Sequence, residues 1–223
     1  MYRFIQKAMV CFVLLTSTYA SAGLLSVVDF TGSSDRVANE FYYYEGDVSI
    51  TLSAWTTNVN SSQESLAPWQ QLTGPDVGLY RSDIGFGVVS NGQDGADLDG
   101  GSSSNLQDLD EGVLISFSEK VDFFGFAASD LSANDDLNLA VVEFVSPGVI
   151  TMRDIFIDRH ASNDGYDIFD VFSGIQGQHF MAWVDGNDDD VRIADMAFAQ
   201  IPEPDTIYIL ALGVLLMNWR LSR

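Results

Sequence analysis

The chain has 223 residues, 47% of them hydrophobic, and its 32 acidic residues outnumber its 10 basic residues to give a net charge of −22. This length suits one medium-sized domain or two small ones. The acidity excludes binding to nucleic acid through phosphates, and the apolar content excludes a disordered acidic tail. The single Cys excludes a disulfide scaffold and a thiolate metal cluster.

The first 22 residues have the pattern of a secretory signal peptide. Two basic residues precede an apolar stretch, residues 8–15, that is too short to cross a bilayer. Ala20 and Ala22 then place small residues at positions −3 and −1 of a cleavage site after Ala22. We expect signal peptidase to remove residues 1–22, and with them Cys11; the alternative is that this segment is a short buried helix of the domain.

Residues 23–200 form the expected exported domain, and their hydrophobic pattern predicts β-structure. Alternating apolar and polar residues indicate half-buried strands over 47–55 and 113–117, and runs that are apolar on both faces indicate inner strands. No segment has the pattern of an amphipathic helix longer than two turns. The further strands that we expect are 24–30, 84–89, 121–127, 137–145, 149–157, 178–184 and 191–199.

This pattern of short strands separated by Gly, Asn, Asp and Ser clusters predicts an all-β, jelly-roll-like β-sandwich. The apolar phase shifts between Ile193 and Met196, which predicts a bulge or bend in the last strand. Residues 58–64 and 93–110 are polar and are expected to be long loops. All but two of the acidic residues lie in this domain, which will repel other anions unless cations intervene.

Catalytic candidates are few, and we assign no catalytic residue. His160 and His179 are the two histidines, and no G-x-S-x-G motif is present to mark a nucleophile. We interpret them as a solvated loop histidine and a histidine at a strand edge. Glu64 and Glu143 are available as a glycosidase pair, but nothing in the sequence brings them together.

Calcium is the cofactor that the sequence favours most. Asp94, Asp97 and Asp99 lie close together beside flexible glycines, and Asp188 and Asp190 lie in a second acidic run. Calcium takes six to eight oxygen ligands, which such loops supply, although no segment fits an EF-hand. The alternative is that these residues form turns on a solvated surface.

Aromatic residues offer a way to bind sugar rings. The candidates are Tyr42, Tyr43, Tyr44, Trp55 and Trp69. The alternative is that these rings pack in the core or at sheet edges. An exposed pair of rings would favour sugar binding, and burial of every ring would count against it.

The C-terminal segment combines a proline pair, an apolar run and basic residues. Pro202, Glu203 and Pro204 form an extended hinge, because neither proline fits a helix interior or a central strand. The apolar run that follows is shorter than the hydrocarbon core of a bilayer. Its hydrophobicity alone fits either a buried C-terminal helix or a weak membrane anchor, with a transmembrane helix at about 206–219. Arg220 and Arg223 would hold its end on the cytoplasmic side as a stop-transfer signal.

This arrangement, on a chain with a signal peptide, resembles the PEP-CTERM sorting signal of Gram-negative surface proteins. The resemblance covers residues 201–223 and implies that Pro202, Glu203 and Pro204 are recognised by the membrane protease exosortase. It also implies an exopolysaccharide-producing bacterium. The family has Ser or Thr directly after the triplet, whereas here Asp205 comes first, and the basic end is split rather than contiguous.

Together these patterns predict a signal peptide (1–22), a β-sandwich ectodomain (23–200) and a sorting signal (201–223). We expect a non-enzymatic protein of the cell surface or extracellular matrix, anchored in the inner membrane before processing and associated with exopolysaccharide or biofilm matrix. The alternative is a carbohydrate-binding module of a surface protein. A secreted hydrolase is the third hypothesis.

Overall fold

The computed structural model describes residues 25–32, 36–57, 68–90, 97–99, 110–129, 136–146, 149–160, 166–184 and 190–201, without the side chains of 99, 136, 154–160, 166–173 and 190. One compact unit comprises Ser26–Phe198, and a second comprises both chain ends, 1–25 and 199–223. The expected signal peptide and sorting tail lie outside the described residues. Within the described residues, no helix has the length and apolar character needed to cross a membrane.

The regular structure in the described part of the chain is all β, which confirms the predicted all-β class, and it is sandwich-like. Its thirteen strands are β1 (Leu25–Asp29), β2 (Arg36–Ala38), β3 (Glu40–Glu45), β4 (Val48–Thr57), β5 (Gln70–Gln71), β6 (Gly78–Arg81), β7 (Phe86–Val89), β8 (Leu98–Asp99), β9 (Asp110–Ser129), β10 (Asp136–Ser146), β11 (Val149–His160), β12 (Tyr166–Trp183) and β13 (Asp190–Gln200).

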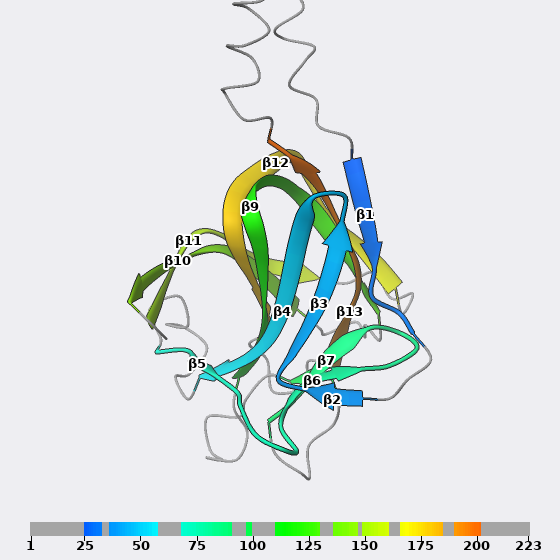
Figure 1. Ribbon diagram of the computed structural model, residues 1–223, viewed down its shortest axis with the longest axis vertical. Coiled ribbons are helices and arrows are strands. Elements are labelled where there is room, and N and C mark those ends of the chain that lie inside the picture. Colours follow the sequence, from blue (N-terminus) through cyan, green and yellow to red (C-terminus); the bar gives the residue numbers. More distant parts are fainter. Residues whose placement is uncertain are drawn as a thin grey trace, which may run out of the picture. The chain divides into compact units, whose positions relative to one another are not determined.

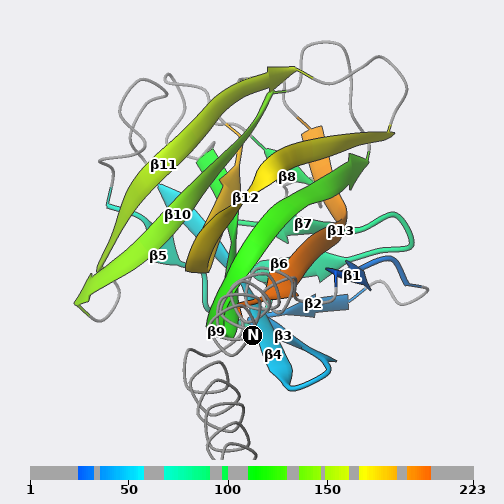
Figure 2. The same cartoon turned by 90° about the horizontal axis from the view of Figure 1, so that it is seen from above.

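Two long strands, β9 and β12, connect the layers of the fold. They pair antiparallel along most of their length and arch over together in Figure 1. The first half of β9 also pairs with β4, and the second half of β12 pairs with β10, which continues to β11. Strand β9 also neighbours β13, and from β13 the sheet continues through β7 and β6 to β2. Figure 2 shows these two groups of strands from above.

We call the strands β3, β4, the first half of β9, the second half of β12, β10 and β11 the front sheet. Alternate residues of its strands point into the inner core between the layers, as Ile50, Ile115 and Phe180 do, and all three are fully buried. Burial of apolar area of this kind is the main term that stabilises such a domain. The residues between them point to the opposite side, which we call the outer face.

Two features differ from the pattern predicted by the sequence, and a third agrees with it. The expected strands 113–117 and 121–127 are a single strand, β9, because the polar residues between them also pair with or lie beside β12. Strand β3 was not expected: Tyr42, Tyr43 and Tyr44 do not alternate in hydropathy, although the fold buries them alternately. The expected phase shift in β13 is visible as the burial of both Ile193 and Ala194.

Candidate functional site

The outer face of the front sheet carries a row of side chains that crosses four strands. Tyr42 on β3 is opposite Thr51 on β4, and Thr51 is opposite Ser116 on β9. Ser116 is in turn opposite His179 on β12. Because paired residues in neighbouring strands present their side chains on the same side of a sheet, these four groups form one line across the outer face.

The middle of this face is lined by short hydroxyl side chains. We call Ser49, Thr51, Ser116 and Ser118 the hydroxyl strip. All four are partly or largely exposed. The Ser49 backbone N–H donates to Ser118 Oγ at 3.1 Å, and Ser116 Oγ lies 2.9 Å from His179 Nδ1. The strip therefore offers hydroxyl donors and acceptors whose positions are fixed by strand pairing.

Two tyrosines stand at the β3 end of the hydroxyl strip. The side chains of Tyr42 and Tyr44 are 62% and 77% exposed, whereas Tyr43 points to the other side and packs against the inner core. The Tyr42 hydroxyl donates to one oxygen of Glu40, and Gln71 Nε2 donates to the other oxygen at 3.2 Å. The hydrogen bond to Glu40 raises the pKa of Tyr42, with the nearby negative charge as a second cause, so this hydroxyl keeps its proton.

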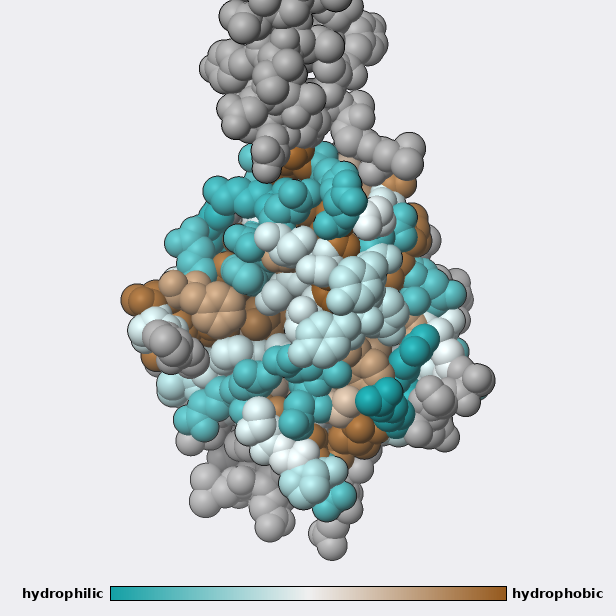
Figure 3. All heavy atoms as spheres, viewed as in Figure 1, coloured by the Kyte–Doolittle hydropathy of each residue, from teal (hydrophilic) through white to brown (hydrophobic). Residues whose placement is uncertain are grey.

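At the opposite end of the strip, Phe144 on β10 is 44% exposed and lies between two other rings. Its centroid is 4.9 Å from that of His179, edge to face, and 6.3 Å from that of Trp55. Burial lowers the pKa of His179, which keeps the imidazole neutral near pH 7. Figure 3 shows a pale face over β3 and β4 and a hydrophobic area beside it, over the end of the β10–β11 hairpin.

The remaining part of the outer face is buried by the chain itself. Trp69 is 2% exposed and packs edge to face on Trp183, with ring centroids 6.3 Å apart. Trp55 is also buried, and its indole N–H donates to Ser53 Oγ at 2.9 Å. The buried residues that form this second cluster, which we call the outer cluster, are Trp55, Trp69, Leu114, Ala140, Val142, Ile150, Met181 and Trp183.

The aromatic residues proposed from the sequence therefore divide into two groups. Tyr43, Trp55 and Trp69 pack inside the protein, as the packing interpretation predicted, while Tyr42 and Tyr44 form an exposed pair on one strand. The remaining members of the site were not identified from the sequence. The alternation of Ser49 and Thr51, and of Ser116 and Ser118, predicted a polar face, but the sequence did not show that β4 and β9 are neighbours. Nothing in the sequence distinguished Phe144 from a core residue.

The calcium candidates lie partly at one sheet edge. Asp99 on β8 is opposite Asp190 on β13, so the fold brings the two acidic runs together. Asp97 forms an ion pair with Arg192, and Asp94 and Asp188 lie outside the described residues. Within the described residues, no group of three or more His, Cys, Asp or Glu side chains is placed to hold a metal ion.

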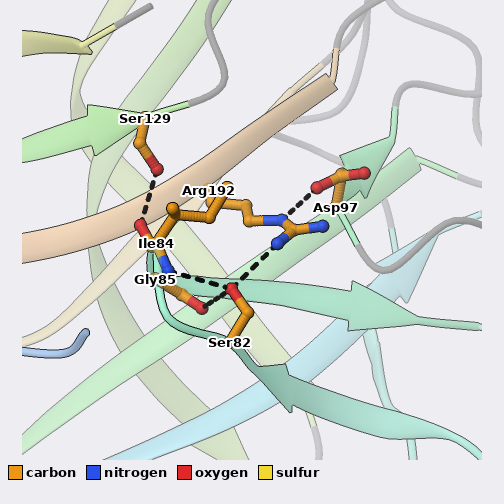
Figure 4. A network of polar contacts seen from close by, with 6 residues as sticks. All are labelled: Ser82, Ile84, Gly85, Asp97, Ser129 and Arg192. Carbon is orange, nitrogen blue, oxygen red and sulfur yellow. Dashed lines mark hydrogen bonds and ion pairs between the residues drawn. The ribbon is translucent and has the colours of Figure 1, made fainter. Parts of the chain in front are cut away.

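The ion pair belongs to a polar network that fastens the turn after β6 to β13 (Figure 4). Arg192 also donates to Ser82 Oγ at 2.8 Å, and Ser82 in turn donates from its hydroxyl to the Gly85 carbonyl at 3.0 Å. Ser129 Oγ donates to the Ile84 carbonyl at 2.6 Å. Gly85 has a φ of 138°, and a Cβ there would lie 2.6 Å from the Ile193 carbonyl oxygen, so glycine is required at this turn.

The catalytic candidates are not brought together among the described residues. His179 lies well inside β12 rather than at a strand edge, because β12 begins at Tyr166, before the expected start. Glu143 is paired with Arg153, with Nε and Oε1 2.8 Å apart. Glu64 and the side chain of His160 lie outside the described residues.

Comparisons with known proteins give distant structural matches to four solved chains. No protein-family model matches the chain, and no curated protein matches it. A solved family 32 carbohydrate-binding module from C. perfringens NanJ, in complex with galactose, is similar with a TM-score of 0.32 and 10% sequence identity. The alignment covers 67% of this chain and 92% of that module.

Proposed function

We propose that the chain is an exported, non-enzymatic surface or matrix protein whose jelly-roll-like β-sandwich binds polysaccharide through the outer face of the front sheet. The observation that carries the proposal is the exposed pair Tyr42 and Tyr44 beside the hydroxyl strip. Sugar rings have apolar faces that pack on aromatic rings and hydroxyl groups that exchange hydrogen bonds with Ser and Thr. The outer face supplies both kinds of contact.

The arrangement of Tyr42 supports this proposal. Two residues apart on one strand, Tyr42 and Tyr44 present their rings on the same side, separated by about 7 Å along the strand. Glu40 holds the Tyr42 ring by its hydroxyl, and Gln71 holds Glu40. A ring that is already positioned loses less conformational entropy when a ligand binds.

Retention by polysaccharides tests the proposal. Full-length protein in a non-glycosidic detergent is run through native gels that contain neutral glucans, xylans, mannans or galactans, and is applied to a glycan array. We expect retention by at least one polymer and its loss in the double variant Tyr42→Ala, Tyr44→Ala. Val27→Ala, which removes an exposed apolar side chain from β1, is the matched control. Retention of the double variant equal to that of the original protein would contradict the proposal.

The export part of the proposal rests on residues 1–22 and on the resemblance of residues 201–223 to a PEP-CTERM signal. Replacing Glu203 by Ala, or deleting 207–223, should change processing and cell association in a host that has exosortase. Asp205→Ala is the control, because this residue lies outside the triplet. Identical fractionation of the variants and the original protein would contradict sorting through this tail and would leave the sugar-binding proposal standing.

A further inference from the structure

We propose, on the basis of the binding face proposed above, that the ligand is an extended glycan chain of about four sugar rings lying across the strands between Tyr44 and Phe144. A single terminal sugar would contact one end of this face and leave the other unused. The inference concerns the class of ligand, and it follows from where the aromatic and hydroxyl groups lie along the face.

The register of the front sheet sets the length of the ligand. Tyr44 lies on β3, opposite Ser49 on β4, and Phe144 lies on β10, against His179 of β12. From β3 to β10 the face crosses β4, β9 and β12, which makes four strand spacings of about 4.8 Å, or about 19 Å in all. An extended oligosaccharide covers such a distance, whereas a monosaccharide does not.

The side chains along this distance change from aromatic to hydroxyl-bearing and back to aromatic, and a glycan chain can contact both kinds. Exposed rings stand at both ends, at Tyr42 and Tyr44 and at Phe144, and the hydroxyl strip lies between them. Ser and Thr are short, so the sheet surface between the rings stays low and a chain can approach its hydroxyl groups. The end rings would pack on sugar faces, while the strip would exchange hydrogen bonds with the sugars between them.

Both ends of the face are held in place before a ligand arrives. The Tyr42 hydroxyl is fixed by Glu40, and Phe144 is fixed between Trp55 and His179. His179 is itself held by Ser116, a member of the hydroxyl strip. Strands β3 and β10 are joined through the paired strands β4, β9 and β12. A chain that reaches both ends therefore gains the second contact at little further entropic cost.

Affinity as a function of chain length tests the inference. Full-length protein in a non-glycosidic detergent is titrated by calorimetry with cello-, xylo-, manno- and galacto-oligosaccharides of one to six rings. For the series that binds, we expect the affinity to rise at least about tenfold from one ring to four and then to level off, as a second contact of about 1.4 kcal/mol requires. Equal affinity for one ring and for four would overturn the inference while the proposed function stands.

Two variants test whether both ends contact the same chain. Tyr44→Ala and Phe144→Ala should each weaken binding of the four-ring ligand about fivefold to tenfold, the loss expected for one aromatic contact. A two-ring ligand is too short to reach both ends, so one of the two variants should leave its affinity unchanged. Val27→Ala is the control, and thermal melting of each variant checks that it is folded.

The outcomes separate the inference from the proposed function. If Phe144→Ala is folded and binds the four-ring ligand as the original protein does, the chain does not reach β10 and the inference is wrong. If none of the oligosaccharides binds and no polysaccharide gel retains the protein, the proposed function itself is wrong. Length-dependent binding that is weakened at both ends supports both.

Discussion

At the scale of single residues, the site depends on side chains whose surroundings change their properties. Tyr42 and Tyr43 are neighbours in the chain, yet one is 62% exposed and the other packs against the inner core. The reason is the two-residue period of a strand, which sends successive side chains to opposite faces. His179 shows the same dependence on place, since its partial burial on the outer face, beside Ser116 and Phe144, lowers its pKa.

His179 should make stability depend on pH. Its pKa is lowered from 6.5 in the folded protein, so the unfolded chain binds the proton more readily. The neutral imidazole therefore makes its full contribution to the free energy of unfolding above about pH 6.5. This contribution is lost as the pH falls through that value and below. We expect the free energy of unfolding in urea to fall less between pH 7.5 and 5.5 in His179→Gln than in the original protein.

An NMR titration provides a second readout for this prediction. The His179 imidazole should titrate with a pKa below 6.5. A titration at or above 6.5, or an unchanged pH dependence in His179→Gln, would contradict the prediction.

At the scale of the elements, the outer face is divided between a buried and an open part. Trp69, which precedes β5, covers the outer cluster, and Gly112 leaves room between the tryptophans of neighbouring strands: a Cβ there would lie 3.2 Å from Trp183 Cβ. The hydroxyl strip lies beside the covered part. Packing of Trp69 thus fixes where the open face begins.

Trp69→Ala should destabilise the protein by about 3 to 5 kcal/mol, because it removes a fully buried aromatic side chain and leaves a cavity over Trp183. Tyr44→Ala removes a ring that is 77% exposed and should change stability by less than about 1 kcal/mol. Urea denaturation of the two variants measures both values. Equal destabilisation by the two variants would contradict the structural role of Trp69 in the outer cluster.

The ion pairs Asp97–Arg192 and Glu143–Arg153 should also contribute unequally to stability. Asp97→Asn leaves the Arg192 side chain, 15% exposed, without its charged partner, and should cost about 2 to 4 kcal/mol. Glu143→Gln changes a pair whose side chains are 49% and 63% exposed, and should cost less than about 1 kcal/mol. Denaturation curves that rank Glu143→Gln as the more destabilising variant would refute the structural role of the Asp97–Arg192 pair.

At the scale of the whole molecule, charge is the dominant property. A chain with a net charge of −22 repels itself, and cations reduce that repulsion. The pairing of β8 with β13 sets Asp99 opposite Asp190 in the strand register. The same net charge would repel an anionic polysaccharide.

Calcium should therefore stabilise the protein. A site at which free calcium is ten times the dissociation constant contributes about 1.4 kcal/mol, which raises the melting temperature by roughly 3 to 6 °C. The measurement is a thermal melt in millimolar calcium and in chelator, with sodium chloride at matched ionic strength to account for screening. Equal melting temperatures in the three conditions would exclude a calcium site.

The sequence by itself determined the local properties of the chain: the all-β class, most strand positions, the phase shift in β13, and a polar face on β4 and β9. These follow from a period of two, which is visible in one strand at a time. The sequence did not reveal β3, whose three tyrosines hide the alternation, or the continuity of β9. Only the tertiary structure decided which strands are neighbours, because pairing joins residues that are far apart in the sequence, such as Thr51, Ser116 and His179. The candidate site exists at that level, since no single strand carries both its rings and its hydroxyl strip.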